Sequence, residues 1–385
     1  MRTKIATQLV RAGRNVARNE GGVNPPVQRV STLILERVAD LYDDDVKTYG
    51  LDGMAVHEAL AEALIAIEGG AGVTFAPSGL AACALPFLAF CQAGDHVLVP
   101  DSVYGPTRRF CDGLLKRFGV ETTYYEPRIG GAIASLLQPN TRFVWMESPG
   151  SLTFEVQDVP AITAAARAAG VATGIDNTWS AGLHFKAFDH GADVSVQALT
   201  KYQAGHADVL LGACLARDAA THAQLRRANK ELGLGMGAPD DVYLCLRGLR
   251  SMPVRLAAQS QSAMRIATWL RGHPDVVEVL HPALPGARDH ELWARDFTGA
   301  AGVFSVVLRP APPERLTAMF EGFKLFAMGF SWGGYESLIV PCMAQLKRTA
   351  ATWRPQGELM RLSIGLEDAD DLIADLDEGF KRLAG

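Results

Sequence analysis

The chain has 385 residues and a mass of 41.3 kDa, more than a single hydrophobic core usually serves, so we expect one large and one smaller domain. Its apolar fraction of 48% and charged fraction of 21% are ordinary for a globular protein and exclude a disordered or fibrous chain. The net charge of −5 is spread without a long block of one sign, which leaves no electrostatic footprint for non-specific nucleic-acid binding.

The first fifty residues show no clear apolar period, and we expect an arm that packs on something else, such as another subunit. The first nineteen residues are basic and lack acids, as in a transit peptide, but no signal-type apolar stretch follows. The longest uncharged apolar run, residues 80–91, is too short to cross a bilayer. The cysteines are dispersed without a CxxC pair, and the histidines lack zinc-site spacing. We therefore expect a cytoplasmic protein without a metal site.

From residue 72 onward, short β-rich runs alternate with turns and alanine-rich helical stretches, one of them at residues 159–170. The expected strands cover residues 73–76, 97–99, 143–146, 171–175, 192–196 and 209–215. Strands that alternate with helices at this spacing predict a mostly parallel sheet covered on both faces. In such a sheet the ligand lies at the carboxyl ends of the strands.

A different arrangement follows the helical pattern that runs from Pro239 towards Arg271. Strong strands are expected at residues 302–308 and 359–364, and a closing amphipathic helix at residues 370–383. The expected organisation is an N-terminal arm, a large domain and a smaller α+β domain, over residues 1–50, 51–244 and 245–385.

Two polar residues stand at the ends of consecutive expected strands. Taken alone, Asp176 would be interpreted as a helix cap and Lys201 as an ordinary surface lysine. Together they form the pair that pyridoxal phosphate needs, because the amine forms a Schiff base and the carboxylate keeps the ring nitrogen protonated. The turn at Ser78 and Gly79, just before a helix, adds backbone N–H groups suited to a phosphate, although such turns are common.

Short motifs along nearly the whole chain resemble those of the Cys/Met-metabolism family of pyridoxal-phosphate enzymes. They are Gln8-Leu9-Val10 with Ala12-Gly13-Arg14, Glu68-Gly69-Gly70-Ala71-Gly72, Glu147-Ser148-Pro149-Gly150, Ile175-Asp176-Asn177-Thr178-Trp179, Thr200-Lys201-Tyr202, Ser331-Trp332-Gly333-Gly334-Tyr335-Glu336-Ser337, and Arg361 with Ile364-Gly365-Leu366-Glu367-Asp368. Trp332, where the γ-lyase branch usually has leucine, points to the β-lyase branch. The resemblance implies an α/β, aminotransferase-like (fold type I) enzyme: a mostly parallel seven-stranded sheet with a smaller C-terminal α+β domain, assembled as a homotetramer built from two dimers that share active sites.

The resemblance also implies a role for each matching residue. Lys201 would carry the cofactor and act as general base, Asp176 would hold the pyridinium nitrogen, and Tyr104 would stack on the ring and assist proton transfer. The remaining cofactor contacts, all around the phosphate, would come from Ser78, Gly79, Leu80 and Thr200. The substrate would be bound by Arg361, Ser331 and Trp332, and by Tyr49 from the neighbouring subunit. Tyr49 would also have a catalytic role. Read without the resemblance, Tyr104 is a turn tyrosine and Arg361 a strand-edge arginine in a surface pair; a guanidinium nevertheless suits a substrate carboxylate.

Two positions depart from the family pattern. Ala198 stands where many relatives have a serine, and Leu51 stands where the family usually has a phosphate-binding arginine after Tyr49. Because the phosphate carries roughly −1.5 to −2 charges, we hypothesise that the cofactor is held less tightly, unless Lys47 substitutes or the backbone groups suffice and Leu51 merely packs. Equilibrium dialysis that finds no tighter cofactor binding in Leu51→Arg would refute this hypothesis.

The activity implied by the resemblance is carbon–sulfur β-elimination from an amino-acid thioether. L-Cystathionine would give homocysteine, pyruvate and ammonia, and a relaxed cysteine-S-conjugate β-lyase is an alternative. A γ-eliminating or γ-replacing enzyme, such as a cystathionine γ-lyase or γ-synthase, is a second alternative. A regulatory protein that has kept the fold and lost turnover is a third, and the complete set of Lys201, Asp176 and Arg361 argues against it. No nucleic-acid or membrane partner is expected.

Overall fold

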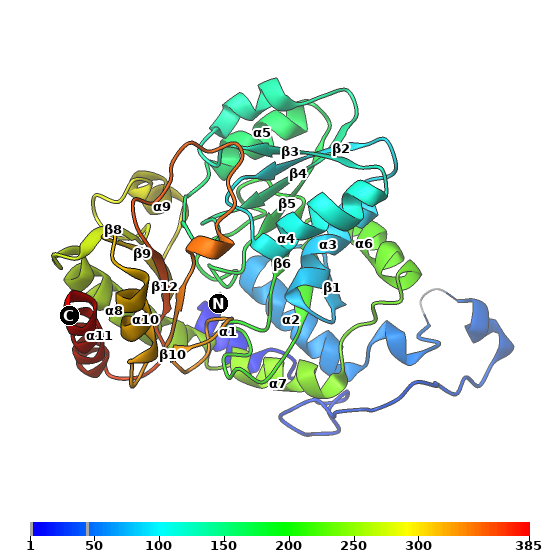
Figure 1. Cartoon of the computed structure of the whole chain (residues 1–385). Helices are drawn as coiled ribbons and strands as arrows, with labels where there is room; N and C mark the ends of the chain where they lie inside the picture. The colour runs from blue at the N-terminus through cyan, green and yellow to red at the C-terminus, as the bar shows by residue number, and fades with distance from the viewer. Residues whose placement is uncertain (1–2, 44–45) are drawn as a thin grey trace.

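A seven-stranded sheet lies at the centre of the larger part of the computed structural model, which describes residues 3–43 and 46–385 (Figure 1). Its strands are β1 (Gly72–Ala76), β2 (His96–Pro100), β3 (Glu121–Tyr125), β4 (Thr141–Glu147), β5 (Ala172–Asp176), β6 (Val194–Gln197) and β7 (Gly212–Ala216). They are arranged in the order β1-β7-β6-β5-β4-β2-β3, and β7 alone runs against the others. The predicted mostly parallel sheet is confirmed.

Helices cover both faces of this sheet. They are α2 (Ala55–Glu68), α3 (Gly79–Phe90), α4 (Gly105–Phe110), α5 (Val159–Ala168), α6 (Ala219–Glu231) and α7 (Pro239–Leu249). The side chains of β4 alternate between two cores: Val144 and Met146 pack with α2, α5 and α7, whereas Phe143 and Trp145 pack with α3 and α6. Burial on both faces explains why these strands are almost continuously apolar.

The smaller C-terminal part is built on a five-stranded sheet of order β10-β11-β12-β9-β8. Its strands are β8 (Val276–Leu280), β9 (Val303–Leu308), β10 (Ala327–Met328), β11 (Leu338–Pro341) and β12 (Leu359–Ser363), and its helices are α8 (Met252–Arg271), α9 (His290–Asp296), α10 (Pro313–Glu321) and α11 (Ala369–Ala384). The prediction of one long helix from Pro239 to Arg271 is wrong. The helix breaks after Leu249, and Pro253, which has no N–H to donate, stands in the first turn of α8.

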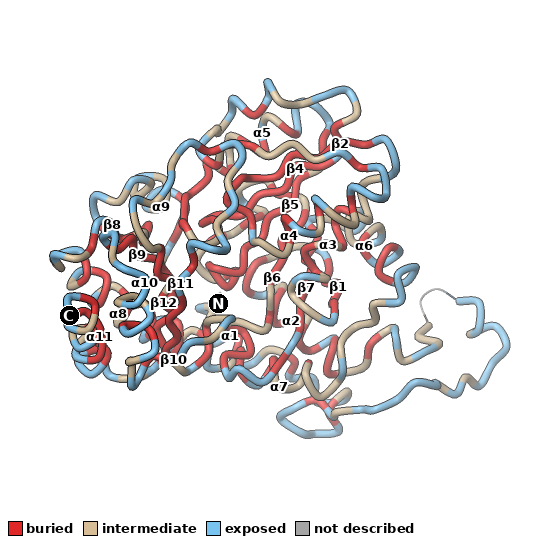
Figure 2. Tube along the Cα trace, in the orientation of Figure 1, coloured by how far each residue is buried: buried red, intermediate tan, exposed pale blue. Residues whose placement is uncertain are grey.

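The N-terminal segment combines a docked helix with an extended arm. Helix α1 (Ile5–Arg11) packs on α2, and its Leu9 is fully buried. The arm that follows extends away from the body and is mostly exposed (Figure 2). It contains the short helical turns η1 (Val38–Tyr42) and η2 (Gly50–Asp52). In the described part of the chain, no helix combines the length and apolar character that crossing a bilayer requires.

Candidate active site

Strands β5 and β6 end side by side, and the residues that follow them form the centre of the site. Asp176, the last residue of β5, pairs in register with Val196 of β6. The hydroxyl of Thr178 accepts a hydrogen bond from the N–H of Ala198 at 2.9 Å, which ties the two strand ends together. Lys201 lies in the turn after β6, where its N–H donates to the carbonyl of Ala198. The acid and the lysine therefore follow neighbouring strands of one sheet.

The amine of Lys201 lies in a largely desolvated position between the two parts of the molecule. It donates to the hydroxyl of Ser331 at 2.7 Å and lies 5.3 Å from the ring centre of Trp332. Burial lowers the pKa of Lys201 to about 8, the positive charge of Arg361 adds to this effect, and Asp176 opposes it. Ser331 has φ +81°, a strained backbone conformation for a residue with a side chain, which is typical of functional sites.

We expect the apoenzyme to capture pyridoxal phosphate at a rate that rises by about tenfold per pH unit below pH 8 and levels off above it. Only the neutral amine is nucleophilic, and the pKa of Lys201 is lowered from 10.5 to about 8, so the neutral form predominates above that pH. The measurement is the rate of the absorbance change on mixing apoenzyme with cofactor between pH 6 and 10. A rate that keeps rising up to pH 10 would show that the lysine has an ordinary pKa.

Two buried carboxylates face the region beside Lys201 without an ion pair to any described residue. Asp176 accepts from the N–H and hydroxyl of Thr178 at 3.0 and 2.5 Å, and from the thiol of Cys83 at 3.4 Å. Glu147, its register partner at the end of β4, accepts from the N–H of Tyr104 at 2.6 Å. Burial raises the pKa of both, and the charge of Asp176 raises that of Glu147 further. A protonated ring nitrogen is the cation that this arrangement lacks, so the acids fit the cofactor.

The start of α3 forms a cradle suited to a phosphate. The Ser78 hydroxyl oxygen caps the helix by accepting from the N–H of Ala81 at 3.1 Å, and its own hydrogen is still available to donate. The N–H groups of Gly79 and Leu80, at the first two helical positions, have no acceptor within the described chain. A Cβ on Gly79 would lie 2.6 Å from that of Ala198, so the approach of the two segments requires glycine. These free donors at a helix terminus fit the phosphate group.

Thr200, the other residue expected at the phosphate, is already engaged by the backbone. Its hydroxyl accepts from the N–H of Leu211 at 3.1 Å and approaches the carbonyl of that residue at 3.3 Å. A phosphate contact from Thr200 stays a prediction, and it would have to compete with these bonds.

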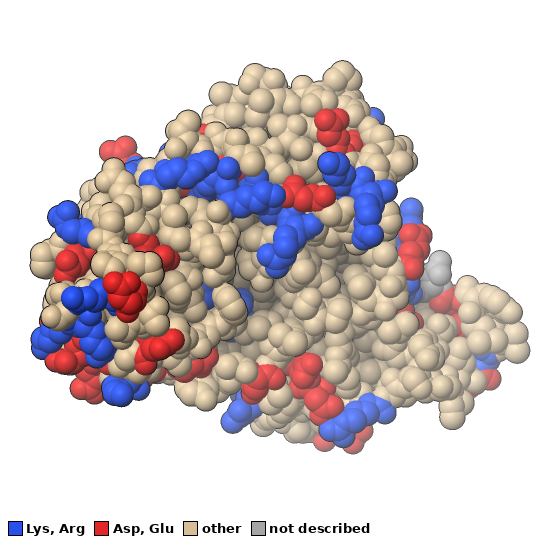
Figure 3. All heavy atoms as spheres, in the orientation of Figure 1, with Lys and Arg blue, Asp and Glu red and all other residues tan. Residues whose placement is uncertain are grey.

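Arg361 approaches the same site from the smaller domain. It lies in β12, and its Nη2 donates to the carbonyl of Ser331 at 3.0 Å. Its Nε is buried without a hydrogen-bond partner in the described chain. An unsatisfied guanidinium donor fits an incoming carboxylate, because one oxygen could take up this orphaned N–H. In Figure 3, Lys and Arg side chains gather along the upper rim of the hollow in the middle of the face, a favourable environment for an anionic ligand.

Tyr49 and its neighbours are not brought to this site within one chain. Tyr49 is half exposed on the arm and bridges Thr32. Lys47 forms an ion pair with Glu58 of α2, so the proposed substitute for the missing arginine already has a partner. The backbone is extended at Tyr49, and Leu51 lies in the 3₁₀ turn Gly50–Asp52 that follows. The looser retention of the cofactor stays a prediction.

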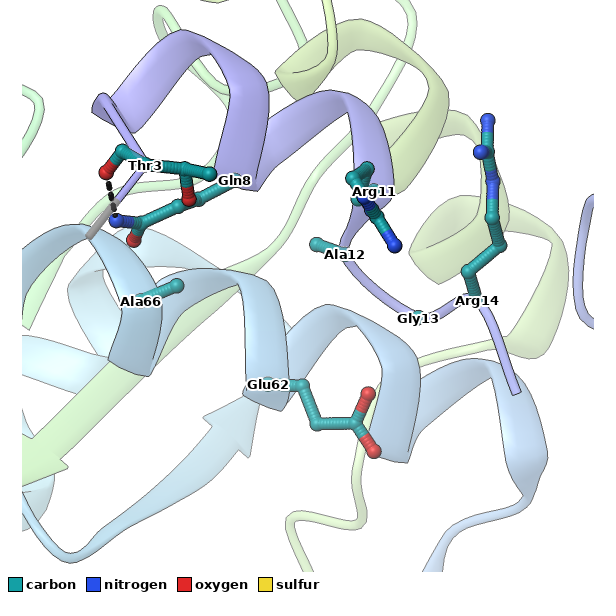
Figure 4. A pocket seen from close by; sticks show the side chains of 8 residues that line it. All are labelled: Thr3, Gln8, Arg11, Ala12, Gly13, Arg14, Glu62 and Ala66. Atoms are coloured by element: carbon teal, nitrogen blue, oxygen red, sulfur yellow. Dashed lines mark hydrogen bonds between the residues drawn. The ribbon is translucent and has the colours of Figure 1, made fainter. Parts of the chain in front are cut away.

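A hollow of about 320 Å³ lies apart from these residues, between α1 and α2 (Figure 4). Its lining includes Arg11, Arg14 and Glu62 but none of the predicted site residues. Glu62 forms an ion pair with Arg18 at 2.9 Å, and Arg14 extends away from Glu62 in Figure 4. Nothing in this hollow resembles a catalytic arrangement. Over residues 3–43 and 46–385 no cluster of three or more His, Cys, Asp or Glu could hold a metal ion.

Three residues of the site were not singled out from the sequence. Glu147 was noted only as part of a motif, although its position at the end of β4, next to Asp176, is the same signal that identified Asp176. Thr178 belongs to the Asp-Asn-Thr motif, and its role as hydrogen-bond donor to the acid could have been proposed from that spacing. Cys83 has no such signal, because only the packing of α3 on the sheet brings its thiol to Asp176.

The comparisons with known proteins agree with this geometry. The profile of the family described as Cys/Met metabolism PLP-dependent enzyme matches residues 6–381. The cystathionine β-lyases of Escherichia coli and Salmonella typhimurium are 45% and 43% identical to this chain over 401 and 396 residues, which cover 99% of each chain. The crystal structure of cystathionine γ-synthase from Xanthomonas oryzae, in complex with aminoacrylate and cysteine, matches with a TM-score of 0.91 at 33% identity and covers 100% of this chain and 99% of that chain. With its fold type I architecture, the chain belongs to the Cys/Met metabolism family of pyridoxal-phosphate-dependent enzymes.

Proposed function

We propose that the protein is a carbon–sulfur β-lyase that cleaves L-cystathionine to homocysteine, pyruvate and ammonia. The observation that carries the proposal is the amine of Lys201, held by Ser331 and Trp332 with a pKa lowered to about 8 and next to Arg361. Relatives named cystathionine β-lyase, from Escherichia coli and Salmonella typhimurium, share 45% and 43% of their residues with this chain over its full length. A cysteine-S-conjugate β-lyase would use the same residues with a different leaving thiol.

Each residue has a part in holding the substrate or moving a proton. When bound, pyridoxal phosphate supplies an aldehyde for the substrate amine and a ring that accepts electrons from Cα. Arg361 would bind the substrate α-carboxylate, and the desolvated amine of Lys201 would remove the Cα proton while Ser331 orients it. The Tyr104 hydroxyl, whose pKa burial raises, stays protonated at neutral pH and is available to protonate the departing thiolate.

The rest of the site would hold the cofactor in place. Asp176 would bind the ring nitrogen, and Tyr104 would stack on the ring. The phosphate would lie on the free N–H groups of Gly79 and Leu80 and on the Ser78 hydroxyl. Gly79 and Ala198 pack so closely that no side chain would fit between the start of α3 and the residue that follows β6.

We predict that purified enzyme releases pyruvate from L-cystathionine at least about ten times faster than 2-oxobutyrate, a margin of about 1.4 kcal/mol between the two transition states. The reason is Trp332, whose wide indole lies beside Lys201 and limits how far the substrate side chain can bend towards it. Both keto acids can be quantified in one reaction by chromatography. Trp332→Leu is the informative variant, and it should lower the ratio of pyruvate to 2-oxobutyrate. Predominant 2-oxobutyrate from the unaltered enzyme would instead establish the γ-elimination alternative, which the match to a cystathionine γ-synthase structure keeps open.

We infer that the enzyme works in the cytoplasm as a homotetramer built from two dimers, in which Tyr49 completes the active site of a neighbouring subunit. The exposed arm supports this, because Ile34, Val38 and Tyr42 are exposed apolar side chains that a partner would cover. We also propose the division into an arm, a large domain and a small domain at residues 50 and 244. Sedimentation of the enzyme with and without the arm tests the assembly.

A further inference from the structure

A loop of the smaller domain crosses onto the larger one next to Tyr104. We call residues 346–354, between β11 and β12, the strap; it lies in the orange-red loop of Figure 1. After the strap the chain enters β12, the strand that contains Arg361. The strap therefore connects the strand of the substrate-binding arginine to the surface around Tyr104.

Asp101 is the residue on which the strap lies. Its carboxylate accepts the N–H groups of Thr349 at 2.9 Å, Ala350 at 2.9 Å and Ala351 at 2.7 Å. The side chain of Asp101 is fully buried, so the carboxylate end of each bond is shielded from water. Three successive backbone N–H groups directed at one carboxylate fix both the position and the direction of the strap.

Arg108, which follows Tyr104 in the chain, contacts both Asp101 and the strap. It forms a buried ion pair with Asp101 at 2.8 Å, and it donates to the hydroxyl of Thr349 at 2.6 Å. The backbone N–H of Arg108 donates to the carbonyl of Tyr104 at 3.0 Å in the first turn of α4. The guanidinium of Arg108 lies 3.7 Å from the ring centre of Tyr124. Tyr104 thus stands in a short segment whose two ends are both fastened to the strap.

We propose that Asp101 is a positioning residue, which with Arg108 holds Tyr104 in its stacking position through the strap. Its function is to keep the ring of Tyr104, on the larger domain, at a fixed position relative to Arg361 on the smaller one. The inference rests on the role proposed above for Tyr104.

A matched control distinguishes positioning from simple anchoring of the strap. Arg348, on the same strap, forms a second buried ion pair, with Glu155 at 2.8 Å. The side chains of this pair form no hydrogen bond with residues 101–108 in the described chain. Loss of either pair loosens the strap, but only loss of the Asp101 pair should displace Tyr104.

The test compares Asp101→Asn with Glu155→Gln in the holoenzyme. We expect Asp101→Asn to weaken the visible circular dichroism of the bound cofactor and to lower kcat by about 10²-fold, the effect typical of a displacement of about 1 Å, with KM much less changed. Glu155→Gln should retain both the dichroism and kcat. Unchanged dichroism and kcat in Asp101→Asn, or equal losses in Glu155→Gln, would overturn the proposal.

Thr349→Val is a milder variant for the case in which Asp101→Asn does not fold. It removes the hydroxyl that accepts from Arg108 and donates to Asp101 at 3.2 Å, so it should weaken the dichroism in the same direction and speed hydrogen exchange of the Ala350 and Ala351 amides. Faster exchange with unaltered dichroism would overturn the proposal. The dichroism does not depend on which keto acid is released, so a failure of the β-lyase proposal and a failure of this one are distinguishable.

Discussion

Replacing Lys201 with alanine is expected to lower turnover by at least about 10⁴-fold while the protein stays folded. The residue serves as both cofactor carrier and general base, and a positioned base alone contributes about 10²–10⁴-fold. The fold should tolerate the change, because within the described residues the amine donates a hydrogen bond to Ser331 alone, and burial disfavours its charge. Pyruvate release measures the first effect, and thermal unfolding of the variant beside wild type measures the second.

Borohydride reduction of the wild-type enzyme identifies the lysine independently of turnover. The reduced cofactor adduct should map to Lys201 by peptide analysis. Lys186 and Lys230 are the informative alternatives: the first donates to the carbonyl of Gly182 at 2.8 Å, and the second forms an ion pair with Asp52 at 2.8 Å. An adduct on either of them would refute the assignment. Lys230→Ala is the matched control, and it should leave turnover unchanged.

The strands that the sequence predicts are those buried on both faces, because burial on both faces produces a continuous apolar run. Strand β4 is an example, with six of its seven residues buried. Strand β3 was missed because it lies at the sheet edge, where one of its five residues is buried and two are threonines. Strand β8, at the edge of the smaller sheet, was missed for the same reason. Strand β1, although also at an edge, is buried at all five residues and was predicted, so β3 and β8 were missed because they lack a continuous apolar run.

The site could be predicted only in part, for a similar reason. Asp176 and Lys201 were found from their strand-end positions, because the order of strands in a parallel sheet brings them together. Ser331 and Arg361 came from the resemblance to a family, since nothing in their local sequence indicates a site. Asp101 follows β2, a strand-end position like that of Asp176, but its role could not be predicted: its partner Ala351 is 250 residues away, and the bond is made by a backbone N–H that carries no sequence information.

Replacing Arg361 with leucine is expected to raise KM for L-cystathionine by roughly 30-fold or more, with a smaller effect on kcat. A buried carboxylate that loses its charged partner costs about 2–5 kcal/mol, and about 1.4 kcal/mol corresponds to a factor of ten. The substitution should not unfold the protein, because the Nε of Arg361 is already unsatisfied and the neighbouring β12 side chains that pack in the small core, Met360 and Leu362, point to the opposite face and are unchanged. Steady-state kinetics of both parameters, with thermal unfolding as a check, make the measurement.

Two comparisons decide whether the carboxylate is what Arg361 recognises. Arg361→Lys keeps the charge but loses the planar pair of donors, so its KM should fall between those of the wild type and the leucine variant. A thioether amine that lacks the α-carboxylate should bind weakly to the wild type and no more weakly to Arg361→Leu, which inhibition constants would show. If leucine weakened the binding of this amine as much as that of cystathionine, Arg361 would be shaping the pocket rather than pairing with the substrate charge. The Nε of Arg361, buried without a hydrogen-bond partner in the described chain while Nη2 donates to the carbonyl of Ser331, favours the pairing.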